Sequence, residues 1–182
     1  MKLVKYLFEY ILIIILFILF KLLGYRIASE FGCLLGKTFG PVFRSKKIIK
    51  NNLKKFDNSL SAEKIEEITS EMWGNYGRIL SEYPYISSFR EGDLDKYIKI
   101  ENIEKLEEIK KGPPVVFVSA HFSNFELMAM AIEKSGINLS AIYRPLNNKM
   151  VNSIMEPLRK KYICKNQIKK GITGVRESLK FF

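Results

Sequence analysis

The only histidine of the chain lies close to a carboxylate, in a pattern that suits acid–base chemistry. His121 is the sole histidine among 182 residues, and Glu126 follows five positions later in the stretch HFSNFE. A carboxylate that accepts a hydrogen bond from one ring nitrogen fixes the imidazole tautomer and leaves the other nitrogen as a general base. The spacing by itself is a weak signal, because an isolated histidine is more often a structural group.

Other polar side chains near this pair suit substrate binding. The sequence lacks the G-x-S-x-G motif of serine hydrolases, so we expect the base to activate a hydroxyl group of an acceptor substrate. Asn124 adds a side-chain amide in the same turn. Arg144 follows the stretch LSAIY, where a guanidinium group can bind a phosphate or a polarised carbonyl oxygen; the alternative is a surface arginine in a turn.

The cysteines do not indicate a metal site. Cys33 and Cys164 are far apart, and neither a C-x-x-C motif nor a second histidine is present. We therefore predict no bound metal and no cofactor. Two free thiols in a reducing compartment are the simplest interpretation, with a disulfide as the alternative.

The elements that must position these residues alternate between strands and helices. We expect strands at residues 95–100, 115–119, 139–143 and 163–168, and helices at residues 101–111, 125–135, 152–162 and 173–182. This order predicts an α/β fold of βαβ units with a mainly parallel sheet. Such sheets bind ligands at the carboxyl ends of their strands, where His121 and Arg144 fall.

A long helix is expected before these units. Residues 61–83 have apolar side chains at helical spacing, Ser61 is a candidate N-cap, and Pro84 ends the pattern. Arg78 and Glu82 lie near the end of this helix. We interpret both as structural residues in preference to functional ones.

The chain opens with an apolar run. Residues 6–23 are apolar except for Glu9 and Lys21, close to the length of about 20 residues that spans a bilayer. A transmembrane helix, a membrane-embedded anchor that does not fully cross, and a signal peptide all fit this pattern. We favour a retained anchor, because no clear small-x-small cleavage site follows. A buried core helix fits less well, since the run is apolar on every side.

The basic residues predict an orientation and restrict the class of partner. Lys and Arg number 30 against 19 Asp and Glu, which gives a net charge of +11. More basic residues follow the apolar run than precede it, which predicts that the body lies in the cytoplasm. The basic stretch 44–55 would then lie near anionic headgroups, or form a solvated loop. The anchor and the lack of a recognisable motif argue against binding to nucleic acid.

Together these features predict three regions. Residues 1–25 form a hydrophobic membrane anchor, residues 26–94 a helical N-terminal region, and residues 95–182 the N-terminal part of an α/β core.

Several of these motifs carry a resemblance when they are taken in order. HFSNFE resembles the H-x4-D/E signature of glycerolipid-type acyltransferases, and the wider sequence is similar to the lipid A biosynthesis lauroyl/myristoyl acyltransferase family. The shared features are the anchor, the N-L-x-x-x-F segment at 52–56, the aromatic-Gly-Arg-x-x-x-Glu pattern at 76–82, the H-F-x-N-x-E block, and Y-R-P at 143–145. Their order matches over essentially the whole chain.

The resemblance implies a glycerolipid acyltransferase-like fold and a reaction. Family members transfer a fatty acyl chain from an acyl carrier protein thioester to a hydroxyl group of a phosphorylated, Kdo-bearing lipid A precursor, at the cytoplasmic face of the inner membrane. By this analogy His121 is the general base and Glu126 orients it, while Arg144 and Asn124 bind substrate. Coenzyme A is the alternative donor.

The chain also departs from the family. Members run to roughly 300 residues, so we expect this sequence to be truncated at its C-terminus and its sheet to be incomplete, with an exposed edge. The alternative function is therefore a catalytically inactive, membrane-bound fragment of such an enzyme.

Overall fold

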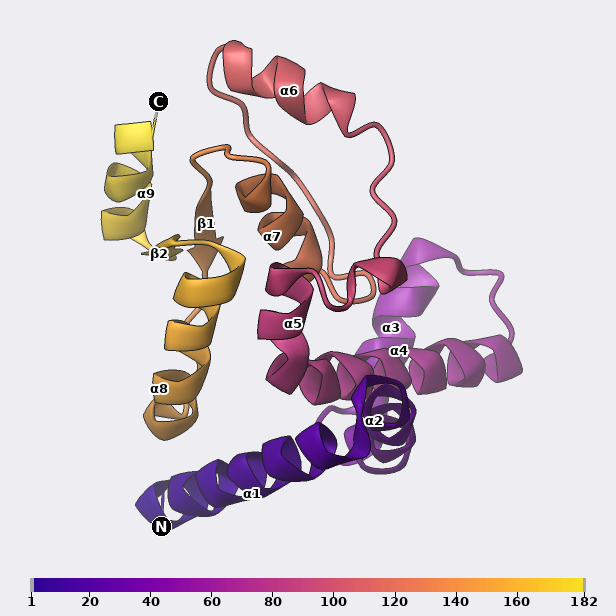
Figure 1. Ribbon diagram of the computed structural model, residues 1–182. Helices are drawn as coiled ribbons and strands as arrows, with labels where there is room; N and C mark the ends of the chain where they lie inside the picture. Colours follow the sequence, from indigo (N-terminus) through magenta and orange to yellow (C-terminus); the bar gives the residue numbers. More distant parts are fainter. Residues whose placement is uncertain (1, 182) are drawn as a thin grey trace. The chain divides into compact units, whose positions relative to one another are not determined.

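The computed structural model describes residues 2–181, and the described chain divides into two compact units. The first unit joins the residues up to Ile15 with the chain from Tyr85 onward, and the second unit runs from Leu16 to Pro84. Helix α1, Lys2–Leu23, begins in the first unit and ends in the second (Figure 1). Within the described residues, α1 alone is long and apolar enough to cross a membrane, as the apolar run predicted.

The second unit is entirely helical. After α1 it contains α2 (Tyr25–Phe39), the 3-10 turn η1 (Gly40–Val42), α3 (Lys46–Phe56) and α4 (Ala62–Glu82). Helix α4 confirms the helix expected at residues 61–83, and the Ser61 hydroxyl caps it by accepting a hydrogen bond of 3.2 Å from the Lys64 backbone N–H. The basic stretch 44–55 is not a loop, because most of it forms α3.

Glycines let α2 and α4 approach each other closely. A Cβ atom at Gly77 would lie 1.9 Å from the carbonyl oxygen of Gly32, and one at Gly36 would lie 2.2 Å from the carbonyl oxygen of Trp73. No side chain fits at such separations, so the two backbones are in direct contact. Gly32 and Gly36 have the four-residue spacing typical of close helix pairs, and no other sequence signal marks this crossing.

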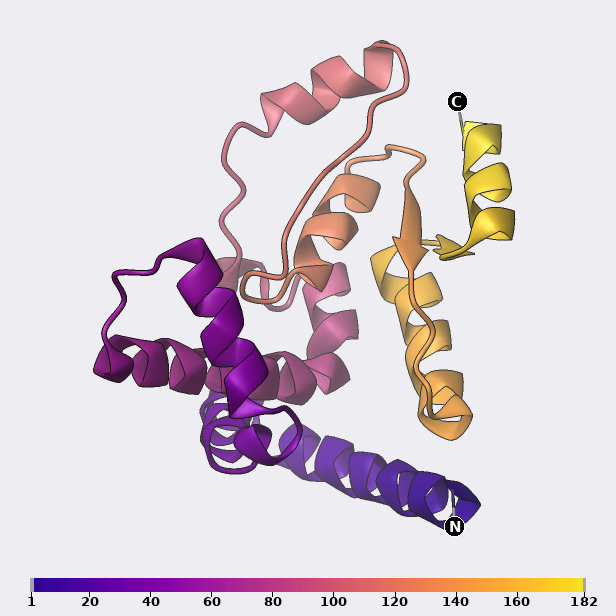
Figure 2. The same ribbon diagram turned by 180° about the vertical axis from the view of Figure 1, so that it is seen from behind.

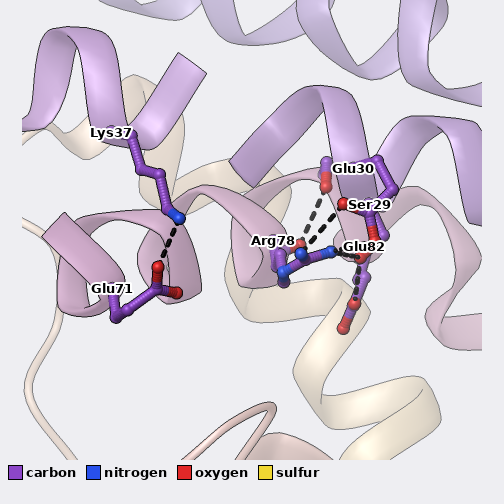
Figure 3. A network of polar contacts seen from close by, with 7 residues as sticks. Ser29, Glu30, Lys37, Glu71, Arg78 and Glu82 are labelled. Carbon is purple, nitrogen blue, oxygen red and sulfur yellow. Dashed lines mark hydrogen bonds and ion pairs between the residues drawn. The ribbon is translucent and has the colours of Figure 1, made fainter. Parts of the chain in front are cut away.

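Polar side chains also connect α2 and α4 (Figure 3). Arg78 donates two hydrogen bonds, of 2.8 and 2.9 Å, to the two carboxylate oxygens of Glu30. These bonds hold the pKa of the exposed Glu30 carboxyl below its ordinary value. The Ser29 hydroxyl donates a buried hydrogen bond of 2.9 Å to Glu82. Arg78 and Glu82 therefore join helices, in keeping with their interpretation as structural residues.

The first unit contains short helices and a small sheet (Figures 1 and 2). Its elements after the 3-10 turn η2 (Tyr83–Tyr85) are α5 (Ile86–Glu91), η3 (Asp95–Tyr97), α6 (Glu104–Lys111), α7 (Glu126–Lys134), β1 (Ser140–Tyr143), α8 (Lys149–Leu158), the π-helical turn η4 (Arg159–Ile163), β2 (Asn166–Lys169), α9 (Ile172–Ser178) and the 3-10 turn η5 (Leu179–Phe181).

Strands β1 and β2 pair in parallel, from Ser140 opposite Asn166 to Tyr143 opposite Lys169. With α8 and η4 between them they form the βαβ unit that the sequence predicted. The strand expected at 163–168 begins three residues later than predicted, because η4 occupies Arg159–Ile163. Pro157 lies just before this turn and has no backbone N–H to donate, which favours a local departure from α-helical bonding.

Two expected strands are wrong. Residues 95–100 form the turn η3 and an irregular segment, closed by hydrogen bonds from Tyr97 N–H to Leu94 O and from Ile98 N–H to Asp95 O. Residues 115–119 form no strand and belong to the long loop between α6 and α7 (Figure 2). Alternation and β-branched composition favour a strand, but a strand also needs a neighbour with which to pair. Among the described residues, the sheet therefore has two strands.

Candidate active site

His121 lies in the loop that leads into α7. Short-range backbone hydrogen bonds tighten this loop, from Phe122 N–H to Ala120 O and from Phe125 N–H to Ser123 O. Ser123 adopts φ = 46°, in the left-handed region that non-glycine residues occupy infrequently. A non-glycine residue in this region raises the free energy of the folded state, and such residues are concentrated at functional sites. The side chain of His121 is exposed, and its ring packs against Phe125 in an edge-to-face arrangement with ring centroids 4.3 Å apart.

Glu126 is the first residue of α7 and is only 8% exposed. Its Oε1 atom accepts a hydrogen bond of 2.9 Å from Arg159 Nε and forms an ion pair of 2.7 Å with Nη2 of the same guanidinium group. The arginine side chain is itself only 16% exposed. A buried carboxylate needs a charged, hydrogen-bonded partner, and η4 supplies that partner here. The carboxylate also benefits from its place at the N-terminus of a helix.

Arg159 is the functional candidate that sequence reasoning missed. It lies 33 positions after Glu126, and it is one of 30 Lys and Arg residues in the chain. No motif or spacing distinguishes it from the others. Only the folding of the βαβ unit brings η4 against the start of α7, so only the tertiary structure identifies the pair.

The other predicted site residues lie near the ends of elements in the same unit. Asn124 is half-buried in the turn before α7, and its backbone carbonyl oxygen accepts a hydrogen bond of 3.1 Å from the Leu127 backbone N–H. Arg144 follows β1 directly and is exposed. The structure thus places Asn124 in the His121–Glu126 turn, while Arg144 extends from a separate loop.

That second loop, residues 144–148, is fixed to α8 by polar contacts. The Leu146 N–H donates to Asn152 Oδ1 over 3.1 Å, and the Asn152 amide donates to Glu156 over 3.0 Å. Asn148 caps α8, because its Oδ1 atom accepts hydrogen bonds from the backbone N–H groups of Met150 and Val151. At the end of β1, burial and the nearby Glu156 carboxylate raise the pKa of Tyr143.

An apolar hollow of about 420 Å³ lies along one face of α7 in the same unit. Its lining is mainly apolar, with Phe89, Leu127 and Met130 among its residues, and it also includes Asp95, Lys134 and Ser135. The volume falls in the range of roughly 300–1,000 Å³ that is usual for ligand sites. Within the described part of the chain, no group of three His, Cys, Asp or Glu side chains is placed to hold a metal ion.

Comparison with known proteins assigns the chain to a family. Residues 1–180 match the family described as bacterial lipid A biosynthesis acyltransferase. Neither curated proteins nor solved structures gave a match. The matched range includes the apolar helix α1, the HFSNFE turn with its buried Glu126 and the exposed arginine after β1. The histidine, the carboxylate and the order of motifs thus agree with a match that covers nearly the whole sequence, and the chain belongs to the bacterial lipid A biosynthesis acyltransferase family.

Proposed function

We propose that this protein transfers a fatty acyl chain from an acyl carrier protein thioester to a hydroxyl group of a lipid A precursor. The observation that carries the proposal is the family match over residues 1–180, which contains the HFSNFE turn. The structure is compatible with it, because the one imidazole of the chain is exposed, and Glu126, five positions later, is a buried carboxylate paired with Arg159.

In this proposal His121 is the general base. Its ring nitrogen removes the proton of the acceptor hydroxyl while the hydroxyl oxygen attacks the thioester carbonyl carbon. The resulting tetrahedral oxyanion collapses, the C–S bond breaks, and an ester is formed. The imidazolium then returns the proton to the leaving thiolate, so that the base is regenerated and the carrier leaves as a free thiol.

Glu126 is the residue that orients His121, and Arg159 is a positioning residue that acts through Glu126. The hydrogen bond and the ion pair with Arg159 fix one carboxylate oxygen at the start of α7, close in sequence to His121. A carboxylate in this position stabilises the imidazolium that forms during the reaction. In this proposal the imidazole of His121 donates a hydrogen bond to the Glu126 carboxylate in the complex with substrate.

Substrate contacts follow from charge and apolar surface. The exposed guanidinium of Arg144 suits the phosphate groups of the acceptor or the oxyanion of the thioester, with Asn124 as a further hydrogen-bonding group. The net charge of +11 favours an acidic carrier protein and a phosphorylated glycolipid. The hollow beside α7 is the best candidate to receive the acyl chain. We place the reaction at the cytoplasmic face of the inner membrane.

One observation favours the alternative, an inactive membrane-bound fragment. Val116 and Val118 are 71% and 90% exposed in the loop that precedes His121, although their composition suits a buried strand. A second polypeptide that paired with this loop would cover both valines and order the site. In that case the 182-residue chain needs this partner for activity.

The test is acyl transfer in membranes that contain the full chain, supplied with acyl carrier protein thioester and a Kdo-bearing lipid A precursor. His121→Ala should lower the rate by at least about 100-fold, the lower bound for loss of a general base. Val118→Thr, a change at an exposed site in the same loop, should retain the rate. Equal rates for His121→Ala and the unchanged chain would contradict the catalytic role. No transfer by the unchanged chain would favour the alternative.

A further inference from the structure

Helix α1 has one apolar face that is exposed along its whole length. Leu3, Leu7, Ile11, Ile15, Ile18 and Leu22 follow one another at three- and four-residue spacing and are between 45% and 80% exposed. In a helix this spacing aligns side chains in a single stripe. The stripe is far longer than the scattered apolar residues of ordinary soluble surfaces, which marks it as a contact surface.

The opposite face of α1 is polar where it meets the first unit. The side-chain amide of Asn148 donates hydrogen bonds of 2.9 Å to the Tyr6 carbonyl oxygen and 2.8 Å to Glu9 Oε2. Asn148 is only 6% exposed and caps α8 at the same time. Lys5 adds an ion pair of 3.7 Å with Glu9. The first half of α1 is therefore tied to the loop that carries Arg144.

The last turns of α1 are likewise attached on one side only. Within the second unit Phe20 is 1% exposed, the ring of Phe17 stacks on Tyr83 with centroids 6.5 Å apart, and Lys21 Nζ donates to the Pro84 carbonyl oxygen over 3.2 Å. In both halves of α1, the residues that make these contacts are different from those that form the exposed stripe.

These contacts do not suit a helix that crosses a bilayer. Glu9 lies about 21 Å along the axis from Leu23, so in a helix that crosses with Leu23 at one interface, Glu9 would lie inside a hydrocarbon core of about 30 Å and Tyr6 near its far edge. Asn148, the exposed Lys149 and the start of α8 would have to follow them there. Backbone outside regular structure and unpaired charges are not tolerated in lipid.

We propose that α1 lies in the plane of the membrane, with the Leu3–Leu22 stripe in the acyl-chain boundary and both ends on the same side of the bilayer. The partner is a lipid bilayer, recognised by a continuous apolar face with the exposed Lys2 at its start. The Lys2 ammonium group reaches the headgroups while its alkyl stem stays in the interface. The proposal is independent of the catalytic activity.

Cysteine labelling of sealed, oriented membrane vesicles tests this proposal with the full chain. One variant carries Lys2→Cys at the start of α1, and a reference variant carries Lys165→Cys, an exposed position in the body of the first unit. The unchanged chain gives the background, because Cys33 and Cys164 are both buried. A maleimide that cannot cross membranes is applied to vesicles of either orientation, and detergent defines full labelling.

An in-plane helix predicts that both positions are labelled in vesicles of the same orientation. Labelling in opposite orientations would show that α1 crosses, and would overturn the proposal. Failure of Lys2→Cys to react in either orientation would place the start of α1 inside the lipid, which also contradicts it. The same pattern is expected in the His121→Ala background, so loss of catalysis and failure of this topology are separate outcomes.

The depth of α1 gives a second readout. Single tryptophans at the stripe positions Leu3, Ile11 and Leu22, in a Trp73→Phe background, are quenched by lipids brominated at shallow or deep positions of the acyl chain. An in-plane helix predicts similar, shallow quenching at all three positions. A crossing helix predicts the deepest quenching at Ile11 alone, which would refute the proposal.

Discussion

Two regions of the molecule use their residues in opposite ways. At the α2–α4 crossing, Gly32, Gly36 and Gly77 leave no space for a single added methyl group. In the loop before α7, the apolar side chains of Val118 and Phe122 are 90% and 81% exposed. Close backbone contact fixes the arrangement of α2 and α4, whereas these two side chains of the loop make few contacts.

The difference separates stability from chemistry. Close packing restricts a helix pair to one arrangement, and every atom in it contributes to the free energy of unfolding. A loop that must admit two substrates cannot be packed in this way. The candidate site therefore depends on one buried ion pair, between Glu126 and Arg159, to hold the start of α7 in place.

The largest effect is expected where a methyl group is added at the crossing. Gly77→Ala places a Cβ atom 1.9 Å from the Gly32 carbonyl oxygen, so α2 and α4 must separate. We expect a loss of about 4 kcal/mol in the free energy of unfolding, above the usual range for overpacking because backbone must move. Thermal unfolding followed by circular dichroism measures it.

A matched glycine provides the control. At Gly112 an added Cβ atom would lie 3.4 Å from the Glu108 carbonyl oxygen, an ordinary contact, so Gly112→Ala should change stability by less than about 0.5 kcal/mol. Equal losses of unfolding free energy for Gly77→Ala and Gly112→Ala would contradict the idea that the α2–α4 crossing is packed more closely than other parts of the chain.

The next effect concerns the buried ion pair of the site. Arg159→Met leaves the Glu126 carboxylate buried without its arginine, and we expect a loss of about 3 kcal/mol together with lower activity. Adding Glu126→Gln to Arg159→Met removes the unpaired buried charge. The double variant should recover part of the lost stability but none of the activity. Chemical denaturation and the transfer assay provide the two readouts.

The neighbouring Lys160 serves as the control for charge. Its ion pair with Glu156, at 2.9 Å, joins a lysine side chain that is 50% exposed, so Lys160→Met should cost less than about 1 kcal/mol. A loss as large as that of Arg159→Met would mean that net charge, and not the buried pair, stabilises this unit.

A smaller effect is expected from the polar contacts between α2 and α4. Ser29→Ala removes the buried hydrogen bond to Glu82, and we expect a loss of about 1.5 kcal/mol, typical of a bond to a charged group. Thr38→Ala, which removes an exposed hydroxyl bonded within its own helix, should be nearly neutral. Melting temperatures of the two variants compare them, and similar shifts would show that the buried bond has no special role.

The smallest effect is expected in the loop itself. Val118→Thr replaces one exposed β-branched side chain by another and should alter the free energy of unfolding by less than about 0.5 kcal/mol. Ile79→Thr, in contrast, places a hydroxyl at a position that is 7% exposed in α4 and should be clearly destabilising. A large loss for Val118→Thr would show that this loop is packed in the native protein.

Much of the local structure could be predicted. Apolar spacing predicted α4, the length of the apolar run predicted α1, and the alternation of short apolar runs with helical segments predicted the parallel pair of β1 and β2. Spacing succeeded at α4 because periodicity reports the burial of one face of an element, and length succeeded at α1 because a run of about 20 apolar residues favours a long helix. They failed at residues 95–100 and 115–119, since a strand is stable only where another strand accepts its hydrogen bonds.

The sequence by itself determined the membership of the family, the candidate base and the apolar N-terminal helix, because these depend on residue types in a fixed order. Only the tertiary structure decided that Arg159 holds Glu126, that glycines join α2 to α4, and that Asn148 ties down the first half of α1. Each of these contacts joins residues more than 30 positions apart. Their pairing depends on how the elements pack, and packing leaves no periodic trace in the sequence.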